Sequence, residues 1–109
     1  MDLHAVTQGG MLVVRAPGSR LEAAIVPMFK RKMIELLDNN SSDVVVDMSD
    51  VEFIDSSGLG ALVGVLRHDA GRRRFELTNV APAVLRVFQL TRLDRVFSIR
   101  QGAPAHHDP

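Results

Sequence analysis

The stretch FIDSSGLGALVGVL, residues 53–66, changes character in its middle, from apolar residues to an acid, two serines and two spaced glycines. Before it, the run DVVVDM (43–48) is short and β-branched, which is typical of a strand buried on both faces. After the serines, four aliphatic residues follow the i, i+3, i+4, i+7 spacing of an amphipathic helix: Leu59, Leu62, Val63 and Leu66. The stretch therefore predicts a strand-to-helix turn with Ser56 and Ser57 at the junction.

The same patterns, followed outward, predict the rest of the fold. A hairpin is expected around Gly9-Gly10, because paired glycines between two strand-like runs favour a tight turn. A helix with Pro27 in its first turn precedes the strand at 43–48, which points to a βαβ crossover. Further segments are a strand at 74–78, a helix from Pro82 and a last strand at 95–100. We expect one α/β domain, a mixed sheet of four or five strands with helices mainly on one face.

Two local predictions accompany this fold. In the strand at 74–78, Phe75 and Leu77 alternate with polar neighbours, which predicts one buried face and one wetter face. The basic run Arg72-Arg73-Arg74 is interpreted as a solvated turn before that strand.

Composition limits the classes of function. The 109 residues suit one domain, for which we expect residues 1–102, followed by a disordered polar tail at 103–109. The 13 basic and 13 acidic residues cancel, so no overall field favours nucleic acid or an anionic membrane. There is no cysteine, no apolar window near the ~20 residues of a membrane span, and no signal-peptide pattern at the N-terminus. A cytoplasmic protein is expected.

Enzyme and cofactor chemistry find little support. The four histidines lack any metal-ligand spacing, and surface or tail positions explain them better. A serine hydrolase would need a glycine two residues before the nucleophile, and His68 lies about three helical turns beyond Ser57. The sequence contains neither of the glycine-rich motifs that bind nucleotide phosphates, G-x-x-x-x-G-K-(S/T) and G-x-G-x-x-G. A helix N-terminus by itself still favours an anion. No cofactor or metal is expected.

The serines have an ordinary explanation as helix N-caps. One helix needs one such residue, whereas Asp55, Ser56 and Ser57 are all capable of it. This surplus suggests a second role. Helical phase alone does not choose between Ser56 and Ser57.

The run VVVDMSDVEFIDSSGLGALVGVL, residues 44–66, resembles the signature of STAS domains of the anti-sigma factor antagonist type. There a hydrophobic strand is followed by D-x-S-x-V-x-F and then by D-S-S-G-L-G at the start of the second main helix. The matching positions are Asp47, Ser49, Val51, Phe53, Asp55, Ser56, Ser57, Gly58, Leu59 and Gly60. The resemblance extends over about residues 3 to 100.

This resemblance implies a phosphorylation-switched binding module, not an enzyme. The family's phosphoacceptor is the serine directly after the aspartate, which matches Ser56. The implied partners are an anti-sigma factor with GHKL-type serine kinase activity, which binds the unphosphorylated form, and a PP2C-type phosphatase; neither direct nucleic-acid binding nor membrane insertion is implied. The implied partner-binding residues are Glu22, Asp55, Ser56, Ser57, Gly58, Leu59 and Gly60.

Three departures from the family pattern bear on this. The family's Gly-x-Leu-Asp before the first helix is replaced by Ser19-Arg20-Leu21-Glu22, with Gly18 displaced by one. A glycine expected after the third helix is Arg92, which makes a left-handed cap costlier. Many members end in another helix, whereas a polar tail is expected here.

Two other functions stay open at this point. STAS domains also serve as accessory subunits of membrane transporters, although those members often lack the serine. A small nucleotide-binding regulator would use the same helix N-terminus to hold a ligand phosphate.

Overall fold

The order of strands and helices is largely the predicted one. The computed structural model describes residues 3–101, so the tail expected at 103–109 lies outside the described residues. The strands are β1 (His4–Gln8), β2 (Met11–Arg15), β3 (Arg20–Leu21), β4 (Asp43–Asp47), β5 (Phe53–Ile54), β6 (Phe75–Thr78) and β7 (Ser98–Arg100). The helices are α1 (Val26–Asp38), α2 (Ser56–Asp69) and α3 (Pro82–Leu90), and a short 3-10 helix, η1 (Leu93–Arg95), precedes β7.

The main sheet has five strands in the order β1-β2-β4-β6-β7. Only β1 is antiparallel, because it forms a hairpin with β2; the remaining neighbours are parallel. At the hairpin, Gly9 and Gly10 both have positive φ (57° and 80°), which glycine adopts without steric cost. The predicted α/β fold with a mixed sheet is confirmed.

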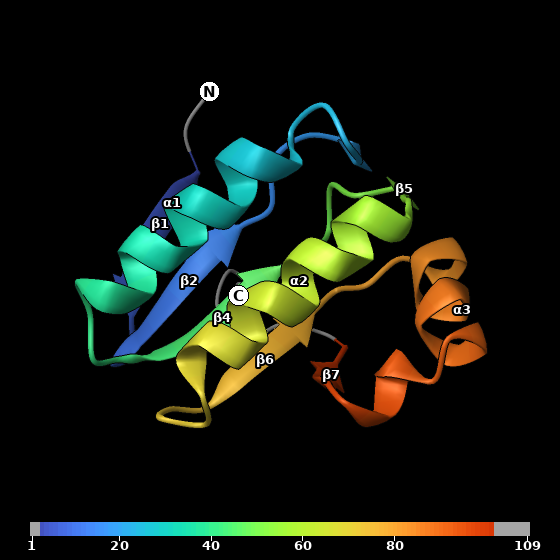
Figure 1. The fold of residues 1–109 in the computed structure, drawn as a ribbon. Helices are drawn as coiled ribbons and strands as arrows, with labels where there is room; N and C mark the ends of the chain where they lie inside the picture. The colour runs from blue at the N-terminus through green and yellow to red at the C-terminus, as the bar shows by residue number, and fades with distance from the viewer. Residues whose placement is uncertain (1–2, 102–109) are drawn as a thin grey trace.

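Helices α1 and α2 cover one face of this sheet (Figure 1) and pack against each other, whereas α3 lies beside β5. The helix-facing side chains of the central strands form the core together with both helices, among them Val14, Val46, Leu77 and Leu62. The predicted apolar stripes are rotated slightly. In α2, Val65 is fully buried whereas Val63 and Leu66 are half-buried, and in α1 the buried residues are Phe29, Met33 and Leu37.

Two local predictions were wrong. Strand β6 has no wet face, because both Glu76 and Thr78 are buried, and the Glu76 carboxylate lies 3.3 Å from Nη1 of Arg100 on the neighbouring β7. The second concerns Arg73, whose side chain is only 9% exposed and whose Nε lies 2.7 Å from a carboxylate oxygen of the buried Asp69. Its guanidinium donates hydrogen bonds to the carbonyl oxygens of Leu37 and Asn40, where α1 ends. Arg72 and Arg74 are exposed, as expected of a turn.

A second, two-stranded sheet was not predicted. Strands β3 and β5 run parallel, with Arg20 opposite Phe53 and Leu21 opposite Ile54. Leu21 and Ile54 point into the core, whereas Arg20 and Phe53 are exposed. This small sheet brings residues 20–23 beside the start of α2 (Figure 1).

Candidate functional site

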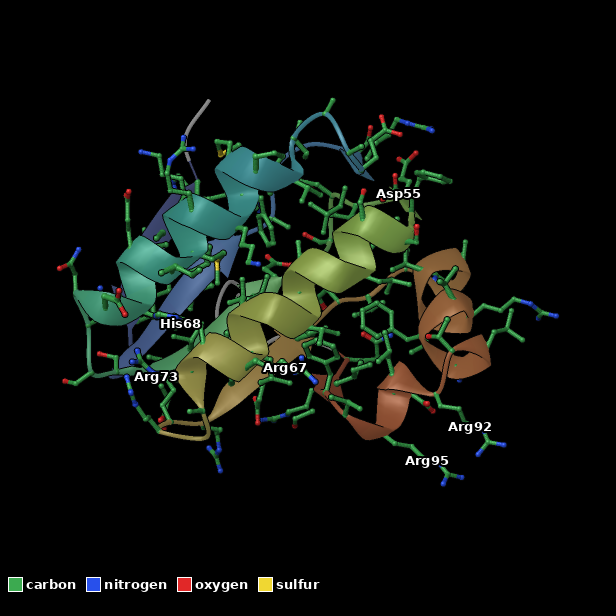
Figure 2. The ribbon with its side chains drawn as sticks, in the orientation of Figure 1. Asp55, Arg67, His68, Arg73, Arg92 and Arg95 are labelled. Atoms are coloured by element: carbon green, nitrogen blue, oxygen red, sulfur yellow. The ribbon has the colours of Figure 1, made fainter. Side chains whose placement is uncertain are left out.

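The junction between β5 and α2 has the predicted strand-to-helix form. Asp55 is the N-cap, with extended backbone angles (φ −102°, ψ −176°), and its side chain accepts a hydrogen bond from the N–H of Gly58. The helix begins at Ser56. Figure 2 shows Asp55 at this end of α2.

The Asp55 carboxylate connects three segments. Its Oδ1 accepts the Ser57 hydroxyl at 2.7 Å and the Gly58 N–H at 2.8 Å, and its Oδ2 accepts the N–H of Ala23 at 3.3 Å. These hydrogen bonds, first of all the one from the Ser57 hydroxyl, lower the pKa of the Asp55 carboxyl below its ordinary value. Asp55 is therefore a carboxylate at neutral pH and ties the segment after β3 to the start of α2.

The two serines differ in their surroundings. Ser57 is half-buried, and its hydroxyl donates to Asp55. Ser56 is exposed, and within residues 3–101 its hydroxyl makes no hydrogen bond. Only Ser56 thus offers a nucleophilic oxygen that is accessible without breaking the helix cap.

The two glycines of the motif also differ. A Cβ atom on Gly58 would lie 2.3 Å from the carbonyl oxygen of Leu21 and 2.8 Å from Cγ1 of Ile54, so only glycine fits against the small sheet. Around Gly60 nothing lies within 4 Å of such an atom, and the residue is exposed. Leu59, between them, is 8% exposed and belongs to the core. Leu59 is therefore a core residue that holds the start of α2 in place, whereas Gly60 is exposed on the surface of the domain.

The predicted partner-binding residue Glu22 forms a group with Arg20 and Phe53, which the sequence analysis did not predict as partner-binding residues. Its carboxylate accepts a hydrogen bond from Nε of Arg20 at 3.1 Å. The Arg20 guanidinium also lies over the ring of Phe53, 4.2 Å from the centroid. Phe53 is 39% exposed, a large fraction for an aromatic side chain. Its outward direction follows from the buried Ile54 beside it, because neighbouring strand residues face opposite sides.

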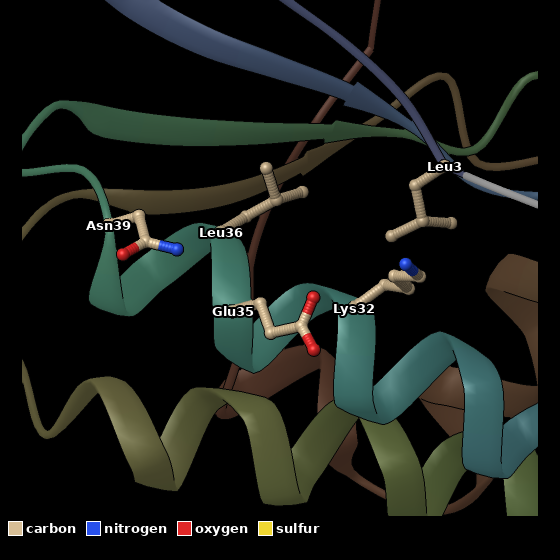
Figure 3. Close-up of a pocket in the computed structure, with 5 residues that line it drawn as sticks. All are labelled: Leu3, Lys32, Glu35, Leu36 and Asn39. Carbon is tan, nitrogen blue, oxygen red and sulfur yellow. The ribbon is translucent and has the colours of Figure 1, made fainter.

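The other candidate features among the described residues lie away from the Ser56 junction. No group of three or more histidine, cysteine or acidic side chains among residues 3–101 is arranged to hold a metal ion. His68 lies 2.7 Å from Asp38, at the far end of α2 from Ser56. A cavity of about 260 Å³ lies between α1 and the start of β1, lined by Leu3, Lys32, Glu35, Leu36 and Asn39 (Figure 3). It is open and shares no residue with the Ser56 junction.

With this geometry established, comparison with known proteins identifies the family. The family model described as STAS domain matches residues 2–105. The chain belongs to the STAS domain family. None of the helices in the part of this STAS domain that the structure describes is long and apolar enough to cross a membrane.

Three relatives illustrate what this STAS domain is similar to. The anti-sigma-B factor antagonist of Staphylococcus epidermidis is 23% identical over 103 residues, which cover 94% of each chain. A solved anti-sigma factor antagonist from Mycobacterium paratuberculosis is 24% identical, with a TM-score of 0.80 over 90% of this chain and 83% of that one. The Bacillus cell fate determinant SpoIIAA in its phosphorylated form is 20% identical, with a TM-score of 0.70 over 94% and 93%.

Proposed function

We propose that this STAS domain is an anti-sigma factor antagonist that is switched by phosphorylation of Ser56. The unphosphorylated domain binds an anti-sigma factor that is also a serine kinase, and phosphate on Ser56 releases it. The observation that carries the proposal is the difference between the serines: the Ser56 hydroxyl is exposed and makes no hydrogen bond among residues 3–101, whereas the Ser57 hydroxyl donates a hydrogen bond to Asp55. The names of the relatives support the same function.

The fold is suited to carry a phosphate at this position. A phosphoserine adds about 1.5 to 2 negative charges at pH 7. Ser56 is the first residue of α2, where the positive end of the helix dipole favours an anion. The negative charge of Asp55 would repel the phosphate. However, its carboxylate accepts three hydrogen bonds, from residues 23, 57 and 58, which stabilise its charge. Because the Ser56 side chain is exposed, the phosphate stays hydrated, and the domain keeps its structure.

Binding to a partner responds differently. In the complex the phosphate loses water against a surface that previously met a small neutral hydroxyl, and such a mismatch costs several kcal/mol. Even ~3 kcal/mol weakens binding by about a hundredfold, at 1.4 kcal/mol per factor of ten. One phosphate is therefore sufficient to switch the complex off without unfolding the domain.

The resemblance to antagonists suggests the classes of partner. The anti-sigma factor would be a GHKL-type serine kinase, and a PP2C-type phosphatase would reset the switch. In this proposal the domain acts by binding, without a cofactor or a reaction of its own, and contacts neither nucleic acid nor the membrane interior.

The test begins with affinity capture from the native bacterium, followed by purification of the captured GHKL-type kinase. Its affinity for the parent domain, Ser56→Ala and Ser56→Asp is then measured by calorimetry. We expect tight binding of the parent and Ser56→Ala, and binding about a hundredfold weaker for Ser56→Asp. Ser41→Asp is the matched control, because Ser41 is exposed in the segment between α1 and β4. Equal binding by Ser56→Asp and the parent would remove the proposal.

A further inference from the structure

The end of α3 and the 3-10 helix after it form an exposed surface that the account so far does not use. We call it the α3–η1 surface and define it by Arg86, Leu90, Arg92, Arg95 and Val96. Leu90 is 75% exposed and Val96 is 53% exposed, more than any other large hydrophobic residue that the structure describes. Two such side chains close together in the chain differ from the single exposed apolar residues that are common on proteins.

The backbone holds this surface in a fixed shape. Arg86 and Leu90 are four residues apart on α3 and therefore share a helix face. The N–H of Arg92 donates to the carbonyl of Gln89, and the N–H of Val96 donates to the carbonyl of Leu93, so the chain folds back on itself. Beneath it the rings of Phe88 and Phe97 pack edge to face, with centroids 5.6 Å apart. A partner would meet a pre-organised surface, which lowers the entropic cost of binding.

The charges of the α3–η1 surface are unbalanced. Among residues 3–101, the guanidinium groups of Arg86, Arg92 and Arg95 have neither an ion pair nor a hydrogen bond, and all three residues are exposed. Asp94 is the acidic residue within the segment. Figure 2 shows the side chains of Arg92 and Arg95 pointing away from the domain on the same side. The uncompensated positive charge selects an acidic occupant, and exposed arginine is a frequent component of protein interfaces.

The backbone at Arg92 adds an independent argument. Its φ is +65°, in the left-handed region that side chains other than glycine adopt at a steric cost. Within the described chain the Arg92 guanidinium makes no hydrogen bond or ion pair that would offset this cost. An arginine in this conformation is explained if its side chain contacts a partner.

The α3–η1 surface continues the switch region. Helix α3 packs against β5, the strand that leads through Asp55 to Ser56. A stable protein interface covers about 800 Å² on each partner, with roughly 20 to 30 residues a side, so a partner seated on Ser56 must extend beyond that junction. A lipid surface fits less well, because the apolar stripe of α3, Val84 and Phe88, is turned into the core.

We infer that the anti-sigma factor bound at Ser56 also contacts the α3–η1 surface, through an acidic segment that carries an apolar side chain. This inference rests on the proposed function. The Leu90 and Val96 side chains take up the apolar group, and the three arginines attract the acidic ones.

The test measures the affinity of the captured anti-sigma kinase for three variants, at about 0.1 M and about 0.5 M salt, which differ in screening. Arg92→Gly removes the guanidinium and relaxes the backbone, so we expect a melting temperature about 4 °C higher together with affinity several-fold lower. The charge reversal Arg86→Glu/Arg95→Glu should weaken binding at least tenfold at about 0.1 M salt and less at about 0.5 M, because salt screens the attraction in the parent and the repulsion in the variant. Leu90→Ser should weaken binding about tenfold. Arg31→Glu, an exposed reversal on α1, is the matched control and should bind like the parent.

The outcomes separate this inference from the proposed function. If the parent binds, Ser56→Asp does not, and all three variants bind like the parent, the inference is wrong and the proposed function stands. If the parent does not bind the kinase, both fail. Two further results would also overturn the inference. One is co-sedimentation of the parent, but not of the charge-reversal variant, with vesicles of about 30% anionic lipid. The other is self-association of the parent that Leu90→Ser abolishes in ultracentrifugation.

Discussion

The Oγ atom of Ser57 lies 2.7 Å from Oδ1 of Asp55, and it is this hydrogen bond that separates the two neighbouring serines. It uses the Ser57 hydroxyl within the helix cap and leaves the Ser56 hydroxyl as the exposed one. The same oxygen of Asp55 accepts the N–H of Gly58, so the start of α2 is fixed before any partner arrives.

The first prediction concerns pH. The folded pKa of Asp55 lies below its unfolded value, so its contribution to stability is present above that unfolded value, about 3.9, and is lost as the pH falls through the folded pKa. The difference in unfolding free energy between the parent and Asp55→Asn should therefore be constant from pH 7 to about 5 and shrink below about 4. Urea unfolding at several pH values measures it. Ser57→Ala removes the main hydrogen bond that lowers the pKa of Asp55, so in this variant the contribution of Asp55 to stability should be lost at higher pH. If the difference in unfolding free energy between the parent and Asp55→Asn stayed unchanged down to pH 2.5, the role given to Asp55 would be refuted.

The second prediction concerns Gly58. In Gly58→Ala the new Cβ would meet the carbonyl oxygen of Leu21 at 2.3 Å, and this backbone atom cannot rotate away. Overpacking of this kind costs about 1 to 3 kcal/mol, which exceeds the ~1 kcal/mol that alanine gains in helix propensity. Urea unfolding should show a less stable variant. Stability equal to that of the parent would mean that the small sheet moves freely relative to α2.

The third prediction concerns Gly60, where substitution by alanine should stabilise the domain instead of destabilising it. Here a Cβ meets nothing within 4 Å, so Gly60→Ala should raise the stability by about 0.5 to 1 kcal/mol. If the glycine is there because the partner approaches α2 closely, the same variant should bind the anti-sigma kinase more weakly. A more stable variant with unchanged affinity would show that Gly60 has no role in the interface.

Features of the fold and the site could be predicted from the sequence where neighbouring residues determine them, and could not where residues far away in the chain do. The burial of Val44, Val45 and Val46 follows from an unbroken β-branched run, and the hairpin follows from Gly9-Gly10. The small β3–β5 sheet was missed because its strands have two residues each, too few for an alternating pattern.

The spacing of apolar residues in the helix could not distinguish Ser56 from Ser57 either. It depends on where one Asp55 oxygen points, and only the resemblance to a family selected Ser56 beforehand. The burial of Arg73 also has a distant cause. Arg73 differs locally from Arg72 and Arg74 only in following Asp69 by four residues, and its other partners, Leu37 and Asn40, lie more than 30 positions away in the chain.

The fourth prediction tests that arginine. Arg73→Met would leave the carboxylate of Asp69, 1% exposed, without its countercharge, and would remove the donors to the end of α1. Breaking a buried ion pair in this way costs about 3 to 5 kcal/mol. Arg72→Met is the control, since Arg72 is exposed, and it should stay within about 0.5 kcal/mol of the parent. Similar stabilities for the two variants in urea would contradict the role of Arg73.

The most direct test of the central claim is phosphoryl transfer itself. The captured anti-sigma kinase is incubated with ATP and with the parent, Ser56→Ala or Ser57→Ala, and the modified residue is mapped by mass spectrometry. The hydroxyl of Ser56 is the exposed one, so the account predicts phosphate on Ser56 in the parent and in Ser57→Ala, and none in Ser56→Ala. Modification of Ser56→Ala as readily as the parent would contradict the assignment of the switch to Ser56.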